Sequence, residues 1–159
     1  MSLMIMEDVL ANPDAYVDDI YRLGFGEFED GENVFKGVQQ RPNTDEFAYV
    51  VSELFQNYDI ALNFVRRSPY MQEEPNFIHT DEMMGDVTCI LYLNKYHPDE
   101  DGTTLYDDEG KPSMIIKAKY NKMFCFDSSM VHSRNMYNNF GEDRDARLIQ
   151  VIFLIRRDE

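Results

Sequence analysis

The spacing of apolar residues changes near residue 60, and this change limits the folds open to the chain. Before that point apolar side chains recur every three to four positions, which is typical of amphipathic helices. From Ile60 onwards they alternate with polar residues in short runs that turn-forming residues separate, which is typical of strands. Helices followed by at least six strands favour an antiparallel barrel or jelly roll with the helices packed on one outer sheet.

The first 60 residues contain two helical patterns. The first has Pro13 in its first turn and is capped by Asn12 or Asp14. The second is expected to be capped by Thr44 and to stop near Asn57. Between them lies a turn-rich stretch, GFGEFEDGEN.

The remainder of the chain is expected to be a series of short strands. Turn-forming residues separate the runs from one another. After IALNFVRR, the expected strands are Phe77 to Thr80, Val87 to Asn94, Thr103 to Tyr106, Met114 to Tyr120, Lys122 to Phe126, Met130 to Asn135 and Arg147 to Ile155.

Length and composition favour one globular domain. The chain has 159 residues, of which 43% are hydrophobic, and no repeat or long linker divides it. We therefore expect a single domain over residues 1–159, mainly β with N-terminal helices. Residues 1–60 would be mainly helical support and residues 61–159 the jelly-roll (double-stranded β-helix, cupin-like) core.

The charge balance disfavours nucleic acid and anionic membranes as partners. Thirty acidic residues against 15 basic ones give a net charge of −15, which would repel nucleic-acid phosphates and anionic membranes.

Both cysteines lie in apolar runs and imply no disulfide. The chain shows no signal peptide and no apolar stretch of membrane-spanning length, so we expect a cytoplasmic protein.

Two of the three histidines are candidate metal ligands. His79 and Asp81 end one expected strand, where side chains two apart share a face, and His132 lies in another. Two imidazoles and one carboxylate suit a non-haem Fe(II) site with open coordination positions. The alternative is a hydrogen-bonded pair at a strand end. His97, in the polar segment KYHPDEDG, is expected to be a solvated loop residue.

Arg147 begins the apolar face of the last expected strand. A guanidinium buried there requires an anionic partner, and its planar fork suits a carboxylate. A dicarboxylic cosubstrate would supply one; an internal acid, or solvent at the strand entrance, would serve equally. Tyr92 points to the same side of its strand as Thr88 and could be a second donor or a core tyrosine. Arg144 is expected to be a solvated charge.

The order of these motifs resembles the 2-oxoglutarate/Fe(II)-dependent dioxygenases, in particular their prolyl-hydroxylase-like branch. The likeness runs from about Tyr70 to Phe153 through HTD, VTCILYLNK, DGTTLY and KMFCFDSSMVH. It implies a double-stranded β-helix with an iron triad of His79, Asp81 and His132. It also implies three residues that bind 2-oxoglutarate. These are Arg147, Tyr92 and, at a looser spacing, Tyr70.

The resemblance implies an activity but no substrate. It predicts an Fe(II) enzyme that couples oxidative decarboxylation of 2-oxoglutarate to hydroxylation of a protein side chain or a small metabolite. A non-catalytic metal- or dicarboxylate-binding β-barrel, or a purely structural module, remains the alternative.

The chain departs from the family in having Asp101-Gly102 where many members have Gly-Gly, and in a longer segment between His132 and Arg147. Its acidic loops, near Asp99 to Gly102 and Tyr106 to Gly110, would attract a basic partner or simply favour solubility.

Overall fold

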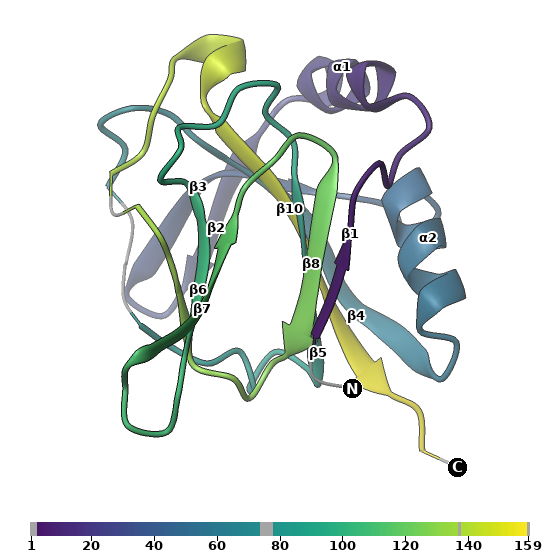
Figure 1. The fold of residues 1–159 in the computed structure, drawn as a ribbon. Helices are drawn as coiled ribbons and strands as arrows, with labels where there is room; N and C mark the ends of the chain where they lie inside the picture. The colour runs from purple at the N-terminus through teal and green to yellow at the C-terminus, as the bar shows by residue number, and fades with distance from the viewer. Residues whose placement is uncertain (1–2, 74–77, 137, 159) are drawn as a thin grey trace.

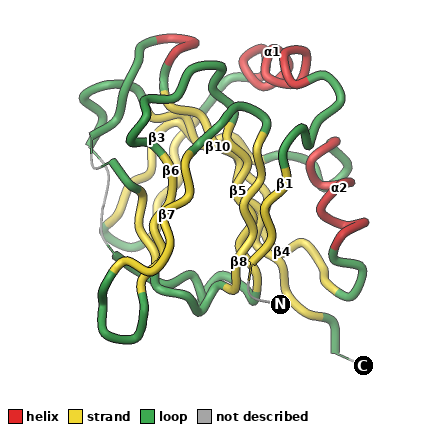
Figure 2. Tube along the Cα trace, viewed as in Figure 1, coloured by secondary structure: helices red, strands yellow, loops and turns green. Residues whose placement is uncertain are grey.

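Two antiparallel sheets and two α-helices make up the structure (Figures 1 and 2). It is a computed structural model that describes residues 3–73, 78–136 and 138–158. Within these residues no helix is long and apolar enough to cross a membrane. In chain order the elements are β1 (Leu3–Met6), α1 (Pro13–Leu23), β2 (Gly26–Asp30), β3 (Asn33–Gln40), α2 (Glu46–Leu54), β4 (Tyr58–Ser68), β5 (Val87–Tyr92), β6 (Gly102–Tyr106), β7 (Pro112–Lys117), β8 (Lys122–Asp127), β9 (His132–Arg134), a 3-10 turn (Asp143–Asp145) and β10 (Arg147–Arg156).

The larger sheet has seven strands in the order β1-β8-β5-β10-β4-β3-β2, and the smaller has three in the order β7-β6-β9. Figure 1 shows the small sheet facing one side of the large sheet, with α2 on the opposite side and α1 across the top. The large sheet is therefore covered on both faces. This explains why all six residues of β5, one of its central strands, are buried.

Alternation along the strands divides the core into two layers. Cys89 and Leu91 of β5 belong to the cluster that packs under the helices, whereas Ile90 and Tyr92 belong to the cluster between the two sheets. Strands β8 and β10 alternate in the same way, since side chains two apart share a face. Arg147 begins the inner face of β10, because it lies two residues before Ile149. The Arg147 side chain therefore points toward the space between the sheets, as the period of two in the sequence predicted.

Side-chain caps begin both helices. The Asn12 side chain accepts a hydrogen bond from the Ala15 amide at 3.1 Å, with Pro13 in the first turn. The second helix is capped by Asp45, not by the predicted Thr44: Asp45 Oδ1 accepts from the Ala48 amide at 2.8 Å. Both residue types cap well, and the carboxylate one position later also suits the positive end of the helix dipole.

The first 60 residues are less helical than expected. The stretch predicted to be turns forms the hairpin β2–β3, and β3 extends the large sheet by pairing with β4. Strand β1 adds the opposite edge by pairing with β8. These strands are mostly exposed or half-buried, so they lack the apolar alternation that marks a strand in sequence. Backbone pairing with β8 on one edge and β4 on the other makes them part of the large sheet.

Candidate active site

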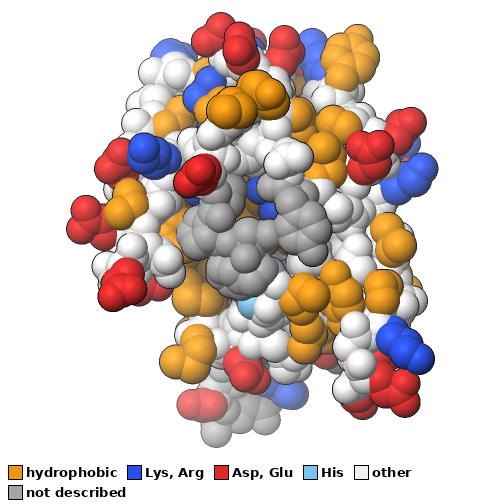
Figure 3. All heavy atoms as spheres, turned by 90° about the vertical axis from the view of Figure 1, so that its left-hand side faces the viewer, with side chains coloured by type: hydrophobic (Ala, Val, Ile, Leu, Met, Phe, Trp, Pro, Cys, Tyr) orange, Lys and Arg blue, Asp and Glu red, His pale blue; other side chains and the backbone are white. Residues whose placement is uncertain are grey.

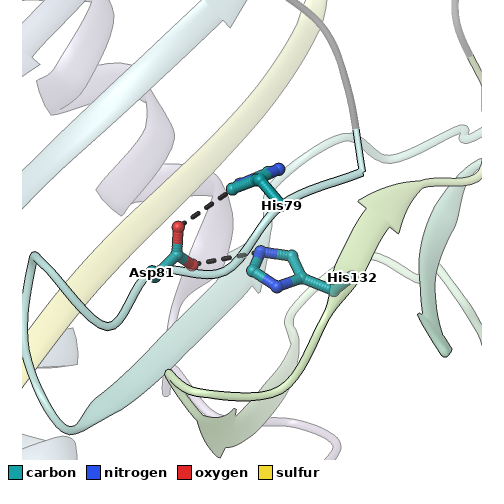
Figure 4. Close-up of side chains that lie close together, drawn as sticks. All are labelled: His79, Asp81 and His132. Atoms are coloured by element: carbon teal, nitrogen blue, oxygen red, sulfur yellow. Dashed lines mark ion pairs between the residues drawn. The ribbon is translucent and has the colours of Figure 1, made fainter. Parts of the chain in front are cut away.

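His79, Asp81 and His132 converge at one end of the space between the sheets (Figure 4). One donor atom from each lies within 4.8 Å of the other two. Asp81 Oδ1 is 3.3 Å from His79 Nε2, and Asp81 Oδ2 is 3.1 Å from His132 Nε2. His79 and Asp81 come from the segment before β5 and His132 from β9, so two regions far apart in sequence build one cluster.

Backbone hydrogen bonds hold these three residues. The His79 amide donates to the His132 carbonyl at 2.9 Å, and the His132 amide donates back to the His79 carbonyl at 2.8 Å. The Asp81 amide donates to the Ser128 carbonyl at 2.8 Å. Of the predicted strand Phe77 to Thr80, Phe77 lies outside the described residues, and the remainder forms a single bridge at His79 instead of a full strand. That bridge alone is enough to align the two histidines.

The hydrogen bonds around His132 orient its ring for a cation. Its Nδ1 lies 3.0 Å from the Met130 carbonyl oxygen, which can only accept, so Nδ1 carries the proton. The Nε2 lone pair of the neutral ring then faces a carboxylate oxygen 3.1 Å away. Two acceptors that face each other need a cation between them, either a proton or a metal ion. The donor set and this arrangement therefore fit a divalent metal.

Asp81 is held in its ionised form. Burial raises the pKa of its carboxyl, but the close approach of the His132 and His79 imidazoles outweighs burial and leaves the pKa below its usual value. Thr88 on β5 donates to Asp81 Oδ2 at 3.1 Å and also bonds the Ser128 hydroxyl at 2.9 Å. An ionised carboxylate with a fixed orientation is what a metal ligand requires.

The three side chains differ in exposure. The His79 side chain is 38% exposed, whereas those of Asp81 and His132 are 12% and 7% exposed. A histidine side chain reaches the surface of the molecule on the face shown in Figure 3. Large apolar side chains near the ligands in sequence are also exposed, among them Ile78, Met83 and Met84. The cluster is thus open to solvent on the His79 side and closed on the side of the sheets.

Arg147 lies at the opposite end of β5 from the cluster and is paired with an internal acid. Its side chain is 7% exposed, and its Nε donates to Oδ1 of the fully buried Asp101 at 3.3 Å. This is the internal-acid alternative left open from the sequence. No described residue accepts a hydrogen bond from either Nη atom of Arg147. The guanidinium therefore still has two donor groups for a second anion.

Tyr92 is fully buried beside Arg147, since it pairs in register with Ile149. Its hydroxyl lies 2.7 Å from Thr103 Oγ1. Burial raises the pKa of Tyr92 to about 12, so the phenol stays protonated and able to donate. Tyr70, in contrast, is 60% exposed, on the segment after β4. Arg144 forms an ion pair with Asp18 and remains 54% exposed.

His97 corrects the expectation of a solvated loop residue. Its side chain is only 3% exposed, and its Nδ1 lies 2.7 Å from Asp101 Oδ2. The charged residues around it in sequence predicted exposure, but its ring packs edge-to-face against Tyr92 and Phe140. Asp101 was likewise assigned to an acidic surface loop and is fully buried.

The one local signal for the burial of Asp101 was the glycine that follows it. Gly102 has φ of +147°, and a Cβ there would lie 1.9 Å from the Ile116 carbonyl oxygen. Only glycine lets β6 begin this close to β7. The Asp101 side chain, just before β6 begins, points inward to His97 and Arg147.

Comparisons with known proteins identify the fold. No protein-family model and no curated protein sequence matches the chain. Among solved structures, the prolyl hydroxylase from Trichoplax adhaerens in complex with a hypoxia-inducible-factor peptide superposes with a TM-score of 0.69. The two are 16% identical over 98% of this chain and 84% of that one. The non-haem α-ketoglutarate-dependent epimerase SnoN from nogalamycin biosynthesis also gives 0.69, at 11% identity over 98% and 78%. A Pseudomonas putida prolyl-4-hydroxylase gives 0.64, at 14% identity over 98% and 93%.

The structural matches agree with the motif order read from the sequence, and the matched proteins include both hydroxylases and an epimerase. The chain therefore has the double-stranded β-helix fold of the 2-oxoglutarate/Fe(II) oxygenases, prolyl hydroxylases among them.

Proposed function

We propose that the chain, as one oxygenase domain over residues 1–159, is a non-haem Fe(II) enzyme that couples oxidative decarboxylation of 2-oxoglutarate to hydroxylation of a substrate. The observation that carries this proposal is the convergence of two imidazoles and one ionised carboxylate within 4.8 Å. His79, Asp81 and His132 would hold Fe(II) on one face and leave the opposite positions for exchangeable ligands. When bound, the iron would supply the reaction with dioxygen and with the keto acid.

The chain's own contribution is to bind and orient the cosubstrate. Arg147 would take the far carboxylate of 2-oxoglutarate through its two Nη atoms, and the Tyr92 hydroxyl would donate a further hydrogen bond to the same carboxylate. Thr88, which contacts Asp81, and Tyr92 lie on the same face of β5, four residues apart, which is roughly 13 Å of extended strand. This spacing supports an extended dicarboxylate between the metal ligands and the arginine.

The residues between these two ends would keep water away from the reaction. The inner layer is apolar and includes Ile90, Phe124 and Val151. Ion pairs and hydrogen bonds to a bound ligand are stronger in such apolar surroundings than in water. The open side of the cluster, near His79 and the exposed Ile78 and Met83, is where a substrate would approach.

We infer a protein side chain or a small metabolite as the substrate class. One structural neighbour was solved with a peptide and another is an epimerase of nogalamycin biosynthesis, so the fold serves both classes. The net charge of −15 disfavours nucleic acid. Tyr70, exposed after β4, is the proposed pocket residue that the contacts support least.

Anaerobic titration of Fe(II) and then 2-oxoglutarate tests the proposal. We expect stoichiometric Fe(II) binding, a visible charge-transfer band on addition of 2-oxoglutarate, and succinate formation after oxygen is admitted. Asp81→Asn should weaken Fe(II) binding by about 100-fold or more, because the only anionic ligand is lost. Glu82→Gln is the matched control, since it removes an exposed charge one residue away. Fe(II) binding without the band and without succinate would support the non-catalytic binding protein instead.

A further inference from the structure

Three buried side chains in contact, His97, Asp101 and Arg147, lie at the proposed cosubstrate end of the site. His97 Nδ1 is 2.7 Å from Asp101 Oδ2, and Arg147 Nε is 3.3 Å from Asp101 Oδ1. The three side chains are 3%, 0% and 7% exposed. Fully buried charges are rare unless they are paired and hydrogen-bonded, and here a histidine is added to an ion pair that is already complete.

The direction of each hydrogen bond follows from its neighbours. The Asn94 amide donates to His97 Nε2 at 3.2 Å, so this nitrogen must be an acceptor. The proton of the neutral ring therefore sits on Nδ1 and is donated to Asp101. The other oxygen of Asp101 accepts from the Gly102 amide at 2.9 Å as well as from Arg147. Each Asp101 oxygen thus has a defined partner, and the carboxylate cannot turn without breaking one of these bonds.

This arrangement restricts how Arg147 can receive a ligand. A guanidinium binds a carboxylate in parallel either through Nε and one Nη or through both Nη atoms. Because Asp101 occupies Nε, only the second mode is open, and no described residue accepts from the Nη atoms.

We propose that Asp101 and His97 are positioning residues for the cosubstrate: they hold the Arg147 guanidinium so that its two Nη atoms receive the far carboxylate of 2-oxoglutarate. This inference rests on the proposed function. It gives His97 and Asp101 a role at the binding end, where the sequence analysis assigned neither residue a function.

A purely electrostatic role for Asp101 predicts the opposite effect on affinity. A carboxylate next to the binding arginine repels an incoming anion, so its removal would tighten 2-oxoglutarate binding if charge alone mattered. If Asp101 instead fixes the arginine, its removal lets the guanidinium turn, and binding weakens. The sign of the change therefore separates the two roles.

His97 offers a second, independent test. Its ring contacts Tyr92 at a centroid distance of 5.7 Å and Phe140 at 6.2 Å, so it could act by packing alone. His97→Phe keeps an aromatic ring and removes the Nδ1 donor. His97→Asn gives up the ring but can place an amide N–H near the position of Nδ1.

The experiment measures the dissociation constant of 2-oxoglutarate for the Fe(II)-loaded protein by anaerobic titration, together with the dissociation constant of Fe(II). We expect Asp101→Asn to weaken 2-oxoglutarate binding roughly 5- to 30-fold, the range for losing about one charge-assisted hydrogen bond. His97→Phe should weaken it about 3- to 10-fold, while His97→Asn stays within about 2-fold of wild type. Fe(II) affinity should be unchanged in all three. Asp99→Asn, which removes an exposed charge of the same loop, is the matched control.

The outcomes separate the inference from the proposed function. Tighter binding by Asp101→Asn, or equal losses in the two His97 variants, would overturn the positioning role and leave the oxygenase proposal intact. Wild-type protein that binds Fe(II) but no 2-oxoglutarate would overturn both. If Asp101→Asn does not fold, the His97 pair decides, since the Asp101–Arg147 ion pair is intact in both variants. With turnover, a positioning role also predicts a raised KM for 2-oxoglutarate with kcat nearly unchanged at saturation.

Discussion

The buried Arg147–Asp101 pair should make the two residues strongly interdependent in stability. At the observed 3.3 Å, two unit charges attract by about 5 kcal/mol at an effective dielectric constant of 20, before the desolvation of both groups is subtracted. Removing one partner leaves the other charge buried, and for such pairs this destabilises by roughly 3–5 kcal/mol. Asp101 retains the His97 donor and the Gly102 amide, so the lower end of that range is expected for Arg147→Met.

Urea unfolding of a double-mutant cycle measures this interdependence. We expect Arg147→Met and Asp101→Asn each to lower the free energy of unfolding by about 3 kcal/mol. The double variant should lose about 2 kcal/mol less than the two losses added together, because neither charge is then left unpaired. Additive losses, within about 0.5 kcal/mol, would show that the pair is not coupled and would refute the argument from burial.

The same pair predicts how stability depends on pH. Burial raises the pKa of Asp101, but the hydrogen bond from His97 and the charge of Arg147 bring it below its usual 3.8. A carboxyl with a lowered pKa in the folded state stabilises the protein above its unfolded pKa, and this contribution is lost as the pH falls through the folded value. The stability advantage of wild type over Asp101→Asn should therefore be full at neutral pH and shrink below about pH 4 in urea titrations. An advantage independent of pH would contradict this reading.

Three further substitutions test single contacts. Thr88→Val removes the hydrogen bond to Asp81 and should weaken Fe(II) binding about 10-fold in a metal titration. Thr80→Val should not, because Asp81 accepts its threonine hydrogen bond from Thr88 and not from the adjacent Thr80. Tyr92→Phe should raise the 2-oxoglutarate dissociation constant about 3- to 10-fold without changing Fe(II) affinity; an unchanged constant would remove Tyr92 from the pocket. Asn12→Ala should lower the free energy of unfolding by about 1 kcal/mol through loss of the α1 cap and leave both ligand affinities as they are.

The sequence predicted the structure correctly where the residues of one short segment determine it. The apolar runs at residues 87–94 and 147–155 predicted both strands, and the period of two in the second predicted the inward face of Arg147. The order of His79, Asp81 and His132 pointed to a single cluster, and the structure brings the three together. The matches to solved structures confirm the oxygenase fold that the motif order implied.

Contacts between distant segments could not be predicted from the sequence. His97 and Asp101 lie in a charged, turn-rich stretch, and apart from Gly102 no neighbouring residue in the sequence indicates that they are buried against Phe140 and Arg147. The hairpin β2–β3 was missed for the same reason, since its residues are mostly exposed and gain their pairing from β4. The hydrogen bond from Thr88 to Asp81 also depends on how the segment before β5 folds back.

The mutual backbone bonds of His79 and His132 bear on how the protein would exchange its metal. Because the main chain already sets both imidazoles side by side, loading an ion would require little chain rearrangement, and folding and metal uptake are separable events. Of the three proposed ligands, only the His79 ring is substantially exposed, so we expect it to dissociate from a bound ion first. An ion bound there would therefore leave from the His79 side, and its loss would leave the paired backbone of both histidines in place.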